Sequence, residues 1–464
     1  MMRLEKKSTI FFLIFYFLSA NLFSAEKVQP ISDSLILSVE EDIDKAIAYL
    51  LLSQIKKTDS TNYYEGEWPS YITNTMNIPF LGKKGKGAYD SNCFTTTFIH
   101  NVLAEIVIED LRHPEIIPVL EKAQKNILLF KTNYTYNFWH LQPRAAHLQK
   151  HSRKRTAEVD MQRRANHFFY KSKMINRYEN IYDDADDTSA GWMAMYFSNE
   201  IKNGQFSKYE HTPIGMLFSK YRDVGKRKTN WYNRKHKFNY RTGAYLTWFG
   251  QEKKHANFFN WFFPDKKKQN ILYGRNEIDC VVNANVIRSL ALFGETNTEG
   301  FADACAFVNA ALENSCQNTC GVYYPTEFTL HYSATKAISS GAALLEKSKD
   351  IMLRQILSLQ REDGSWQSEL ENNDIQATLY AVNSLLRIGE CEKNGTLKPI
   401  EKAMQYIRRS AIHEGAVTYW LGGVFFSGGS AIRYAHVWRS DALTTALAVE
   451  ALTQYRKLLE QQKK

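Results

Sequence analysis

Four carboxylates crowd into five residues near the middle of the chain: Asp183, Asp184, Asp186 and Asp187. They open an apolar stretch, and in a helix Asp187 shares a face with Asp183 and Asp184. Like charges at this spacing raise one another's pKa, so a carboxyl group here can stay protonated near neutrality and donate a proton to a substrate. The same pattern also suits the N-terminal cap of a helix or a divalent-cation site.

Polar residues near the starts of other apolar stretches add to this set. Asp279 and Asn283 lie four residues apart, with Asn285 near them, and Trp438 and Arg439 precede a further stretch. Asn is a poor helix former, so we expect hydrogen-bonding roles for these amides. If the helix ends surround one cavity, all five residues are candidates for substrate binding. Capping of their own helices is the other interpretation.

Two stretches rich in glycine and aromatic residues, 241–249 and 419–426, favour short strands over helices. Tyr245 and Trp248, in the first stretch, are further candidates for substrate binding. Each stretch precedes a predicted helix of the cavity wall, so we expect either lids over the cavity mouth or structural hairpins. Aromatic residues make up 13% of the chain, enough to line an apolar pocket or enlarge the core.

The elements that position these residues follow a repeated pattern. Polar and small residues lead into an apolar stretch with helical spacing at 91–105, 183–197, 279–293, 332–345, 374–388 and 440–452. Further helical stretches lie between them, such as 43–54, 114–129 and 352–360. Six repeated helices, each with a partner, predict an all-α fold, an α/α-toroid in which helical hairpins form a ring.

Two short elements precede helices of this pattern. They are Gln360–Trp366 (QREDGSW), before 374–388, and Glu65–Pro69 (EGEWP), before 91–105. Glycine permits a tight turn after a helix, and tryptophan can then pack back across the hairpin. We therefore expect both elements to be structural clasps.

These residues carry a resemblance to a known family. Gln360–Trp366 resembles the Q-x-x-D-G-x-W repeat of the squalene/hopene cyclases and related triterpene and diterpene cyclases, and Asp184–Ser189 (DADDTS) resembles their D-x-D-D-T-A acid motif. The resemblance implies the toroid of the terpene cyclase and prenyltransferase class and a class II isomerase or lyase. It further implies that Asp186 donates the proton, that Asp184 and Asp187 tune it, and that aromatic faces stabilise the resulting carbocation.

Metal and cofactor expectations are few. Asp183–Asp187 also fits the D-D-x-x-D magnesium–diphosphate motif of class I prenyl-transfer enzymes, but no second motif of the form N-D-x-x-S-x-x-x-E accompanies it. A divalent cation at this cluster remains the alternative to acid catalysis. No Cys-x-x-Cys pair or His-Glu-x-x-His motif is present, so no zinc site and no cofactor are predicted.

The first 25 residues predict export. Arg3, Lys6 and Lys7 precede the apolar run Ile10–Leu18, and small residues follow, which is the order of a secretory signal peptide. We expect a periplasmic or secreted protein, with one toroid domain over 33–464 and insertions at about 141–180 and 201–270. The six cysteines permit disulfides in that compartment, and Cys316 with Cys320 would close a small loop.

The net charge of +10 is concentrated in the two insertions. Residues 141–180 hold ten Lys or Arg against three Asp or Glu, and residues 201–270 hold sixteen against four. Export argues against nucleic acid as the partner. A small apolar or anionic substrate, or peripheral contact with an anionic membrane, fits better, and a solvated insertion over the core is the plain alternative.

We therefore expect a terpene cyclase-like exported enzyme that starts the cyclisation or isomerisation of a polyisoprenoid by protonation. One alternative is a periplasmic glycan-active hydrolase or lyase, with two separated carboxylates in an open groove. The other is a non-catalytic toroid that binds a lipid or a protein partner. Fold analogy alone does not choose among them.

Overall fold

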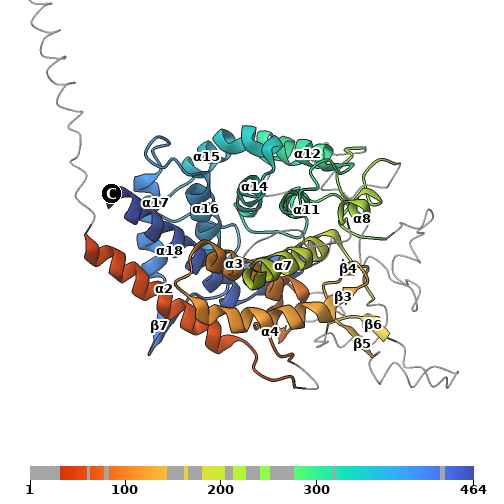
Figure 1. Cartoon of the computed structure of the whole chain (residues 1–464), viewed down its shortest axis with the longest axis horizontal. Coiled ribbons are helices and arrows are strands. Elements are labelled where there is room, and N and C mark those ends of the chain that lie inside the picture. The colour runs from red at the N-terminus through yellow and green to blue at the C-terminus, as the bar shows by residue number, and fades with distance from the viewer. Residues whose placement is uncertain are drawn as a thin grey trace, which may run out of the picture.

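The computed structural model describes residues 32–59, 63–77, 83–143, 161–165, 180–203, 213–225, 241–250, 276–316, 320–428 and 434–463. Six of the helices in this part of the chain form an inner ring (Figure 1). They are α3 (Cys93–Glu109), α7 (Ala185–Asn203), α11 (Cys280–Leu292), α14 (Thr329–Ser339), α16 (Asp374–Ile388) and α18 (Asp441–Lys463). Each helix contacts the next and α18 contacts α3, so the ring closes. The prediction of an all-α toroid is confirmed.

The outer helices pack against this ring (Figure 1). They are α2 (Asp33–Ser53), α4 (Ile117–Ile127), α12 (Phe301–Glu313), α15 (Lys349–Leu357) and α17 (Leu397–Arg409), with the 3-10 helices η1 (Pro114–Ile116) and η3 (Ala343–Ser348). The short helices α8 (Gly215–Ser219) and η2 (Leu128–Phe130) complete the helices of the described residues, and η2 packs against α4. Outer helices bury one stripe: α17 buries Ile400, Ala403, Met404 and Ile407, spaced for one face. Inner helices such as α11 are buried almost all round, as their small and apolar residues require.

The predicted helices match these elements with one correction. The stretch 374–388 coincides with α16, whereas 332–345 does not form a single helix. Helix α14 begins earlier, at Thr329, and ends at Ser339, and η3 follows from Ala343. Gly341 lies between them with φ +103°, a backbone conformation that ends a helix and that glycine adopts without a steric penalty.

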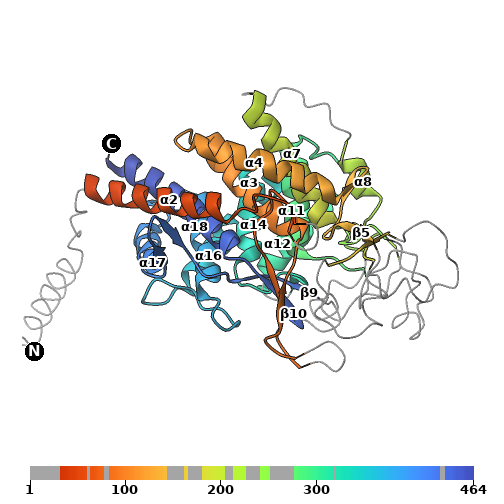
Figure 2. The same cartoon turned by 90° about the horizontal axis from the view of Figure 1, so that it is seen from below.

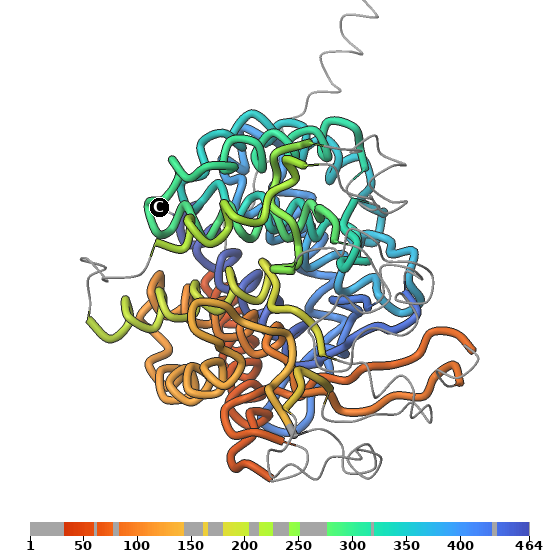
Figure 3. Tube along the Cα trace, turned by 90° about the vertical axis from the view of Figure 1, so that its right-hand side faces the viewer, coloured from red at the N-terminus to blue at the C-terminus, as the bar shows by residue number. Residues whose placement is uncertain are grey.

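A small antiparallel sheet joins an early segment of the chain to a late one. Its strands are β1 (Tyr71–Asn74), β2 (Gly87–Tyr89), β9 (Val424–Gly428) and β10 (His436–Arg439), in the order β2-β1-β10-β9. β1 therefore pairs with β10, although the two strands are far apart in the sequence. Figures 2 and 3 show these early and late segments side by side. Three two-stranded hairpins complete the strands of the described part: β3 (Lys131–Thr132) with β4 (Thr135–Tyr136), β5 (Leu141–Pro143) with β6 (Met161–Arg163), and β7 (Ile412–Glu414) with β8 (Val417–Tyr419).

The two glycine-aromatic stretches behave differently. The stretch 419–426 contributes to β8 and β9, as predicted. The stretch 241–249 forms only the isolated bridges Arg222–Tyr245 and Asp184–Trp248, so the strand prediction is wrong there. Its backbone bonds are divided among Tyr221 and Asp223, Glu277, and the residues Asp183 and Ala185 at the start of α7, which leaves no continuous ladder with another strand.

Both predicted clasps are structural and share one geometry. The indole N–H of Trp366 donates to the carbonyl of Ile356 at the end of α15, and that of Trp68 donates to Leu50 in α2. A glutamine completes each clasp: Gln360 Nε2 donates to the carbonyls of Gly364 and Pro399, and Gln54 Nε2 donates to those of Gly66 and Val119. Each clasp thus joins the end of one outer helix to the next outer helix.

A buried ionic network occupies the middle of the ring. Its members come from five inner helices: Glu105, Arg288, Lys336, Arg387 and Glu450. Lys336 Nζ lies 2.5 Å from Glu450 Oε1 and also pairs with Glu105. Burial alone would raise the pKa of Glu450, but Lys336 and Arg387 outweigh it and hold that pKa below its ordinary value.

The cysteine pairing differs from the expected one. Cys280 is bonded to Cys320, whereas Cys316 is buried and its Sγ donates to the carbonyl of Ala311. The pair joins the first residue of α11 to the loop before α14, so the expected Cys316–Cys320 loop is wrong. The backbone places Cys320 against α11 and turns Cys316 into the end of α12.

Several expectations concern segments outside the described residues. These include the signal peptide at 1–25 and most of the basic segments 141–180 and 201–270. In the residues that the structure does describe, no helix has both the length and the apolar character needed to cross a bilayer.

Candidate active site

The acid motif forms the first turn of α7. Asp184 caps this helix, because its Oδ1 accepts the backbone N–H of Asp187 at 2.8 Å. Asp183 stands just before the cap and accepts hydrogen bonds from Thr135 Oγ1 (2.5 Å) and Asn137 Nδ2 (2.9 Å). Both of its oxygens are thus occupied, which makes Asp183 an anchor for the start of the helix.

Two segments hold the backbone of the motif in place. The N–H of Ala185 donates to the carbonyl of Thr247 at 2.7 Å, and the N–H of Phe249 donates to that of Asp183 at 2.9 Å. On the other side, the N–H of Asp184 donates to the carbonyl of Tyr136 in β4. The acid motif is therefore clamped between the β3–β4 hairpin and the stretch 241–249.

Two opposing effects act on the charge of Asp186: burial disfavours the ionised form, and two hydrogen-bond donors favour it. Asn285 Nδ2 donates to Oδ1 at 2.8 Å, and the hydroxyl of Tyr324 donates to Oδ2. Burial raises the pKa of Asp186 to about 6, while the bonds from Tyr324 and Asn285 act to lower it. The carboxyl group is 5% exposed. It can therefore hold a proton at mildly acidic pH and leave a stabilised carboxylate after donating that proton.

Asp184 and Asp187 form a second, coupled pair of carboxyl groups. Burial, and then repulsion between the two groups, raises the pKa of Asp184 well above its ordinary value, and burial likewise raises that of Asp187. The two side chains hydrogen-bond each other, and the Cys93 thiol also bonds to Asp187. Raised pKa values favour protonation within such a pair, which lowers the negative charge that it places beside Asp186.

An aromatic cluster begins at the Tyr324 ring that contacts Asp186. Tyr324 lies 5.8 Å, between ring centroids, from both Phe94 and Phe426. Phe426 also packs against Tyr323, Phe138 and Trp438, at 5.7, 5.1 and 5.3 Å respectively. Phe426 is only partly buried, so part of its ring surface remains accessible. Aromatic faces next to an acid suit the stabilisation of a cation formed by protonation.

Two further buried carboxylates border the aromatic cluster. Asp90 accepts the indole N–H of Trp438 at 2.7 Å and that of Trp139 at 3.1 Å. Burial raises the pKa of Asp90 to about 6. Glu277 accepts the hydroxyl proton of Tyr323. Both carboxylates lie outside the acid motif and bond to members of the aromatic cluster.

Solved structures share this architecture. The chain matches the type II terpene cyclase MstE from Scytonema in complex with its product merosterolic acid A, with 13% identity, a TM-score of 0.53 and coverage of 91% of this chain and 98% of that one. It matches MstE in complex with its substrate geranylgeranyl dihydroxybenzoate at 12% identity and a TM-score of 0.51. A crystal structure of a protein from Actinoplanes gives 12% identity and a TM-score of 0.52, with 90% of this chain and 99% of that one covered.

The chain has a terpene cyclase-like fold. The match covers 98% to 99% of each of these neighbours. No family model matches the sequence, and no curated protein matches it. The likeness therefore concerns the fold, and the chemistry has to be argued from the chain's own residues.

Within this terpene cyclase-like fold, Asn285 and Trp438 lie in the site, whereas two other candidates, Asp279 and Asn283, bind backbone groups. Asp279 caps α11 through Oδ1 and, through Oδ2, accepts the N–H groups of Val322 and Tyr323, next to Tyr324. Asn283 exchanges hydrogen bonds with the backbone of Tyr245. These residues position the loops around Asp186 without contacting it.

The remaining candidates for substrate binding, Trp248, Tyr245 and Arg439, do not contact the acid motif with their side chains. Trp248 donates its indole N–H to the hydroxyl of Tyr323 at 2.9 Å and so joins the aromatic cluster. The ring of Tyr245 packs on Phe218, away from the acid motif. Arg439 donates to the carbonyl of Gly422 at 3.3 Å.

Sequence reasoning missed Tyr324, Cys93 and Asp90. Tyr324 stands in a loop with neither helical nor strand periodicity, so no local pattern marks it. Cys93 begins α3, in the repeat position equivalent to the start of α7, and that equivalence is the signal that points to it. Asp90 precedes the cap of α3 with no acidic neighbour, so its meeting with two tryptophans depends entirely on the tertiary fold.

The arrangement does not fit the alternative of a divalent cation at the acid motif. The oxygens of Asp183 and Asp186 already accept hydrogen bonds from side chains that are themselves fixed. Burial raises the pKa of both Asp184 and Asp187 and so favours their protonated forms, with which a cation would have to compete. A magnesium site needs several ionised or carbonyl oxygens facing one point, and this donor set does not supply them.

Proposed function

We propose that this chain is an exported terpene cyclase-like enzyme that protonates a polyisoprenoid or a related apolar substrate and so starts its cyclisation or isomerisation. The observation that carries the proposal is the environment of Asp186. This carboxyl group is buried, has a pKa raised to about 6, and accepts hydrogen bonds from Asn285 and Tyr324. A protonated acid with a stabilised conjugate base is what protonation of an alkene or epoxide requires.

The aromatic cluster supports the second half of the reaction. Protonation leaves a carbocation, which water would quench and which aromatic faces stabilise. Tyr324 contacts the acid, and the rings of Phe94 and Phe426 lie 5.8 Å from the Tyr324 ring. A terpene cyclase of the same fold, MstE, has geranylgeranyl dihydroxybenzoate as its substrate, which makes a prenyl chain the substrate class to test first.

The glycan-active alternative has less support. It calls for two separated carboxylates in an open groove, with aromatic rings stacking on sugars. Asp184, Asp186 and Asp187 are instead at most 5% exposed and stand within one helical turn. Such burial suits an acid for an apolar substrate better than a pair flanking a hydrated sugar.

Export is proposed together with this function. The Cys280–Cys320 bond supports an oxidising compartment, since disulfides persist outside the cytoplasm. Contact with an anionic membrane through the basic segments is part of the same proposal, because a polyisoprenoid substrate would be membrane-dissolved. Fractionation of cells that produce the chain, with a thiol-alkylation assay of Cys280 and Cys320, tests both parts.

The decisive experiment is turnover in deuterated water. The purified protein is incubated with squalene, its terminal epoxide and geranylgeranyl dihydroxybenzoate, and products are analysed by mass spectrometry. Acid initiation places one non-exchangeable deuterium on carbon in each product molecule. The final carbocation loses a different proton, so the product is an isomer of the substrate with one hydrogen replaced by deuterium. We expect Asp186→Asn to lower this turnover by about 100-fold to 10,000-fold.

Asp350→Asn, an exposed acid on the outer helix α15, is the matched control and should turn over as the wild type does. Products without deuterium, or Asp186→Asn with wild-type turnover, would show that Asp186 is not the initiating acid.

A further inference from the structure

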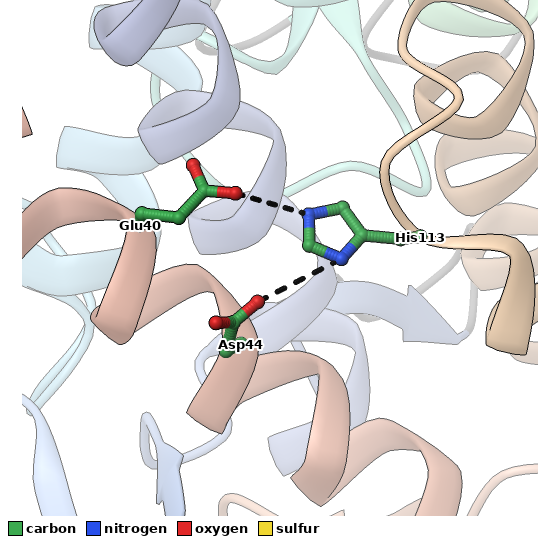
Figure 4. A group of neighbouring side chains, drawn as sticks. All are labelled: Glu40, Asp44 and His113. Atoms are coloured by element: carbon green, nitrogen blue, oxygen red, sulfur yellow. Dashed lines mark ion pairs between the residues drawn. The ribbon is translucent and has the colours of Figure 1, made fainter. Parts of the chain in front are cut away.

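Asp90 is a buried carboxylate without a cationic partner in the part of the chain that the structure describes. It follows β2 and is 1% exposed. Elsewhere a buried ionisable group faces groups that can carry the opposite charge: His113 lies 3.8 Å from a carboxylate oxygen of Glu40 and from one of Asp44 (Figure 4). A buried charge without such a partner costs stability, so the presence of a carboxylate at this position calls for another explanation.

Two indole groups hold the carboxylate of Asp90. Trp438 Nε1 donates to Oδ2 at 2.7 Å, and Trp139 Nε1 donates to Oδ1 at 3.1 Å and to Oδ2 at 3.2 Å. Trp438 belongs to β10, whereas Trp139 lies between β4 and β5. One carboxylate therefore joins two aromatic rings that come from distant parts of the chain.

Anchoring an indole does not by itself require a carboxylate. Four tryptophans outside the aromatic cluster donate their indole N–H to backbone carbonyls: Trp68, Trp192, Trp366 and Trp420. A neutral carbonyl oxygen thus satisfies a buried indole in this protein, without the cost of burying a charge. What Asp90 adds at the two indoles of the cluster is its negative charge.

This charge lies next to the rings that surround the candidate acid. The Trp438 ring packs 5.3 Å from the Phe426 ring, and Phe426 lies 5.8 Å from Tyr324, whose hydroxyl donates to Asp186. Phe426 is only partly buried, so part of its ring is open to a ligand. In a buried site a charge acts over several ångströms, because little water screens it. The field of Asp90 therefore favours a cation at this ring surface.

We propose that Asp90 is the counter-charge of the aromatic cluster: its carboxylate, bonded to the indoles of Trp139 and Trp438, makes the accessible ring surface select apolar cations over neutral molecules of similar size. The inference rests on the proposed function, in which the cation is the carbocation that protonation forms. Asp90 acts through the two indoles and through its field, without touching the substrate, so it is a positioning residue. A prenyl chain that ends in a protonated amine carries the same charge in a stable form and can serve as a probe.

The test compares two ligands of the purified full chain, N,N-dimethylgeranylgeranylamine, which is protonated at pH 8, and geranylgeranyl methyl ether, which is neutral. Burial raises the pKa of Asp90 to about 6, so this group is ionised at pH 8. Both ligands are titrated in the same neutral detergent, and binding is followed by the quenching of tryptophan fluorescence. We expect the wild type to bind the amine about 10-fold to 100-fold more tightly than the ether.

Variants of Asp90 separate its charge from its role as an anchor. Asp90→Asn should weaken binding of the amine by about 10-fold or more and hardly change binding of the ether, whereas Asp90→Glu, which keeps the charge, should retain the preference. Asparagine offers a single acceptor oxygen to two indoles, so Asp90→Asn can fold poorly. Asp90→Ala, which leaves room for water to accept from both indoles, then reports on the charge, with circular dichroism as the check of folding.

Asp350→Asn, which removes an exposed acid on α15, is the control and should bind both ligands as the wild type does. Equal weakening of the amine and the ether in the Asp90 variants would overturn the proposal, because it would show that Asp90 only anchors the rings. A wild type without any preference for the amine would overturn it too. The proposed function fails by a different measurement, since it is judged by deuterium incorporation and by the turnover of Asp186→Asn.

Discussion

Asp186 and the Asp184–Asp187 pair lie in the same helix turn, but their neighbours stabilise the ionised carboxylate to different degrees. Asp186 receives two donated hydrogen bonds, from Asn285 and Tyr324, which stabilise its ionised form. Asp184 Oδ2 and Asp187 Oδ1 receive none within the described part of the chain. Asp186 is therefore the residue that can lose a proton at low cost, while the raised pKa values of the pair favour its protonated forms.

This difference predicts the pH dependence of activity. The acid form of Asp186 is the active one, so turnover should fall as pH rises through about 6, the raised pKa of this group. Tyr324→Phe removes a bond that favours the carboxylate, so the pKa should rise, the falling limb should move to higher pH, and the maximal rate should drop. Turnover measured from pH 4 to 9 tests this, and an unchanged midpoint in Tyr324→Phe would contradict it.

The coupled pair makes a prediction about stability. A carboxyl group whose folded pKa is raised above its unfolded value stabilises the fold at low pH, and this stability is lost as pH rises through the folded pKa. Asp187→Asn removes the ionisable group and lets an amide donate to Asp184. We expect it to raise the free energy of unfolding by about 2 kcal/mol at pH 8, and by less at pH 4. Denaturant unfolding at both pH values measures this, with Asp350→Asn, an exposed acid, as the neutral control.

At the scale of elements, the clasps depend on glycines that meet a neighbouring helix. A Cβ on Gly364 would lie 2.2 Å from the carbonyl oxygen of Lys402 in α17, and one on Gly66 would lie 2.2 Å from that of Lys122 in α4. Both glycines also have positive φ, +90° and +92°. No side chain fits without moving the outer helix, which explains why each clasp has glycine before its tryptophan.

Gly364→Ala should therefore lower the free energy of unfolding by about 3 kcal/mol or more, because steric overlap adds to backbone strain. Gly395→Ala is the matched control, since Gly395 has φ +65° but open space around its Cα. Its cost should be limited to the strain of about 1–2 kcal/mol. Equal losses in the two variants, measured by urea unfolding, would show that contact with α17 does not matter.

The elements also mark what sequence alone can predict. α16 could be located to the residue because its periodicity, its first acidic turn and Gly389 after it all agree. Asn285 could be proposed from its place in a helix. Tyr324 could not, because a loop fixed by the Asp279 contacts and the Cys280–Cys320 bond brings it to Asp186. Local patterns predict helices, whereas contacts made by loops across the ring depend on the tertiary fold.

The whole ring is held at its centre by the network of Glu105, Arg288, Lys336, Arg387 and Glu450. Three cations face two carboxylates, and Lys336 bridges both of them from a site that is 1% exposed. Removal of one partner would leave buried charges unpaired, which costs more than the pair itself contributes. Its members come from five of the six inner helices, so the complete network can form only when the ring is closed.

Glu450→Gln should consequently lower the free energy of unfolding by about 3–5 kcal/mol at pH 7. The pKa of Glu450 is held below its ordinary value, so its contribution is present above the unfolded pKa and is lost as pH falls. This is the opposite sign to the Asp184–Asp187 pair. The wild type should then be most stable at intermediate pH, with Glu450→Gln flattening the acid limb and Asp187→Asn flattening the alkaline one. Unfolding curves from pH 3 to 9 test this assignment. A Glu450→Gln protein as sensitive to acid as the wild type would show that other carboxylates determine the closure of the ring at low pH.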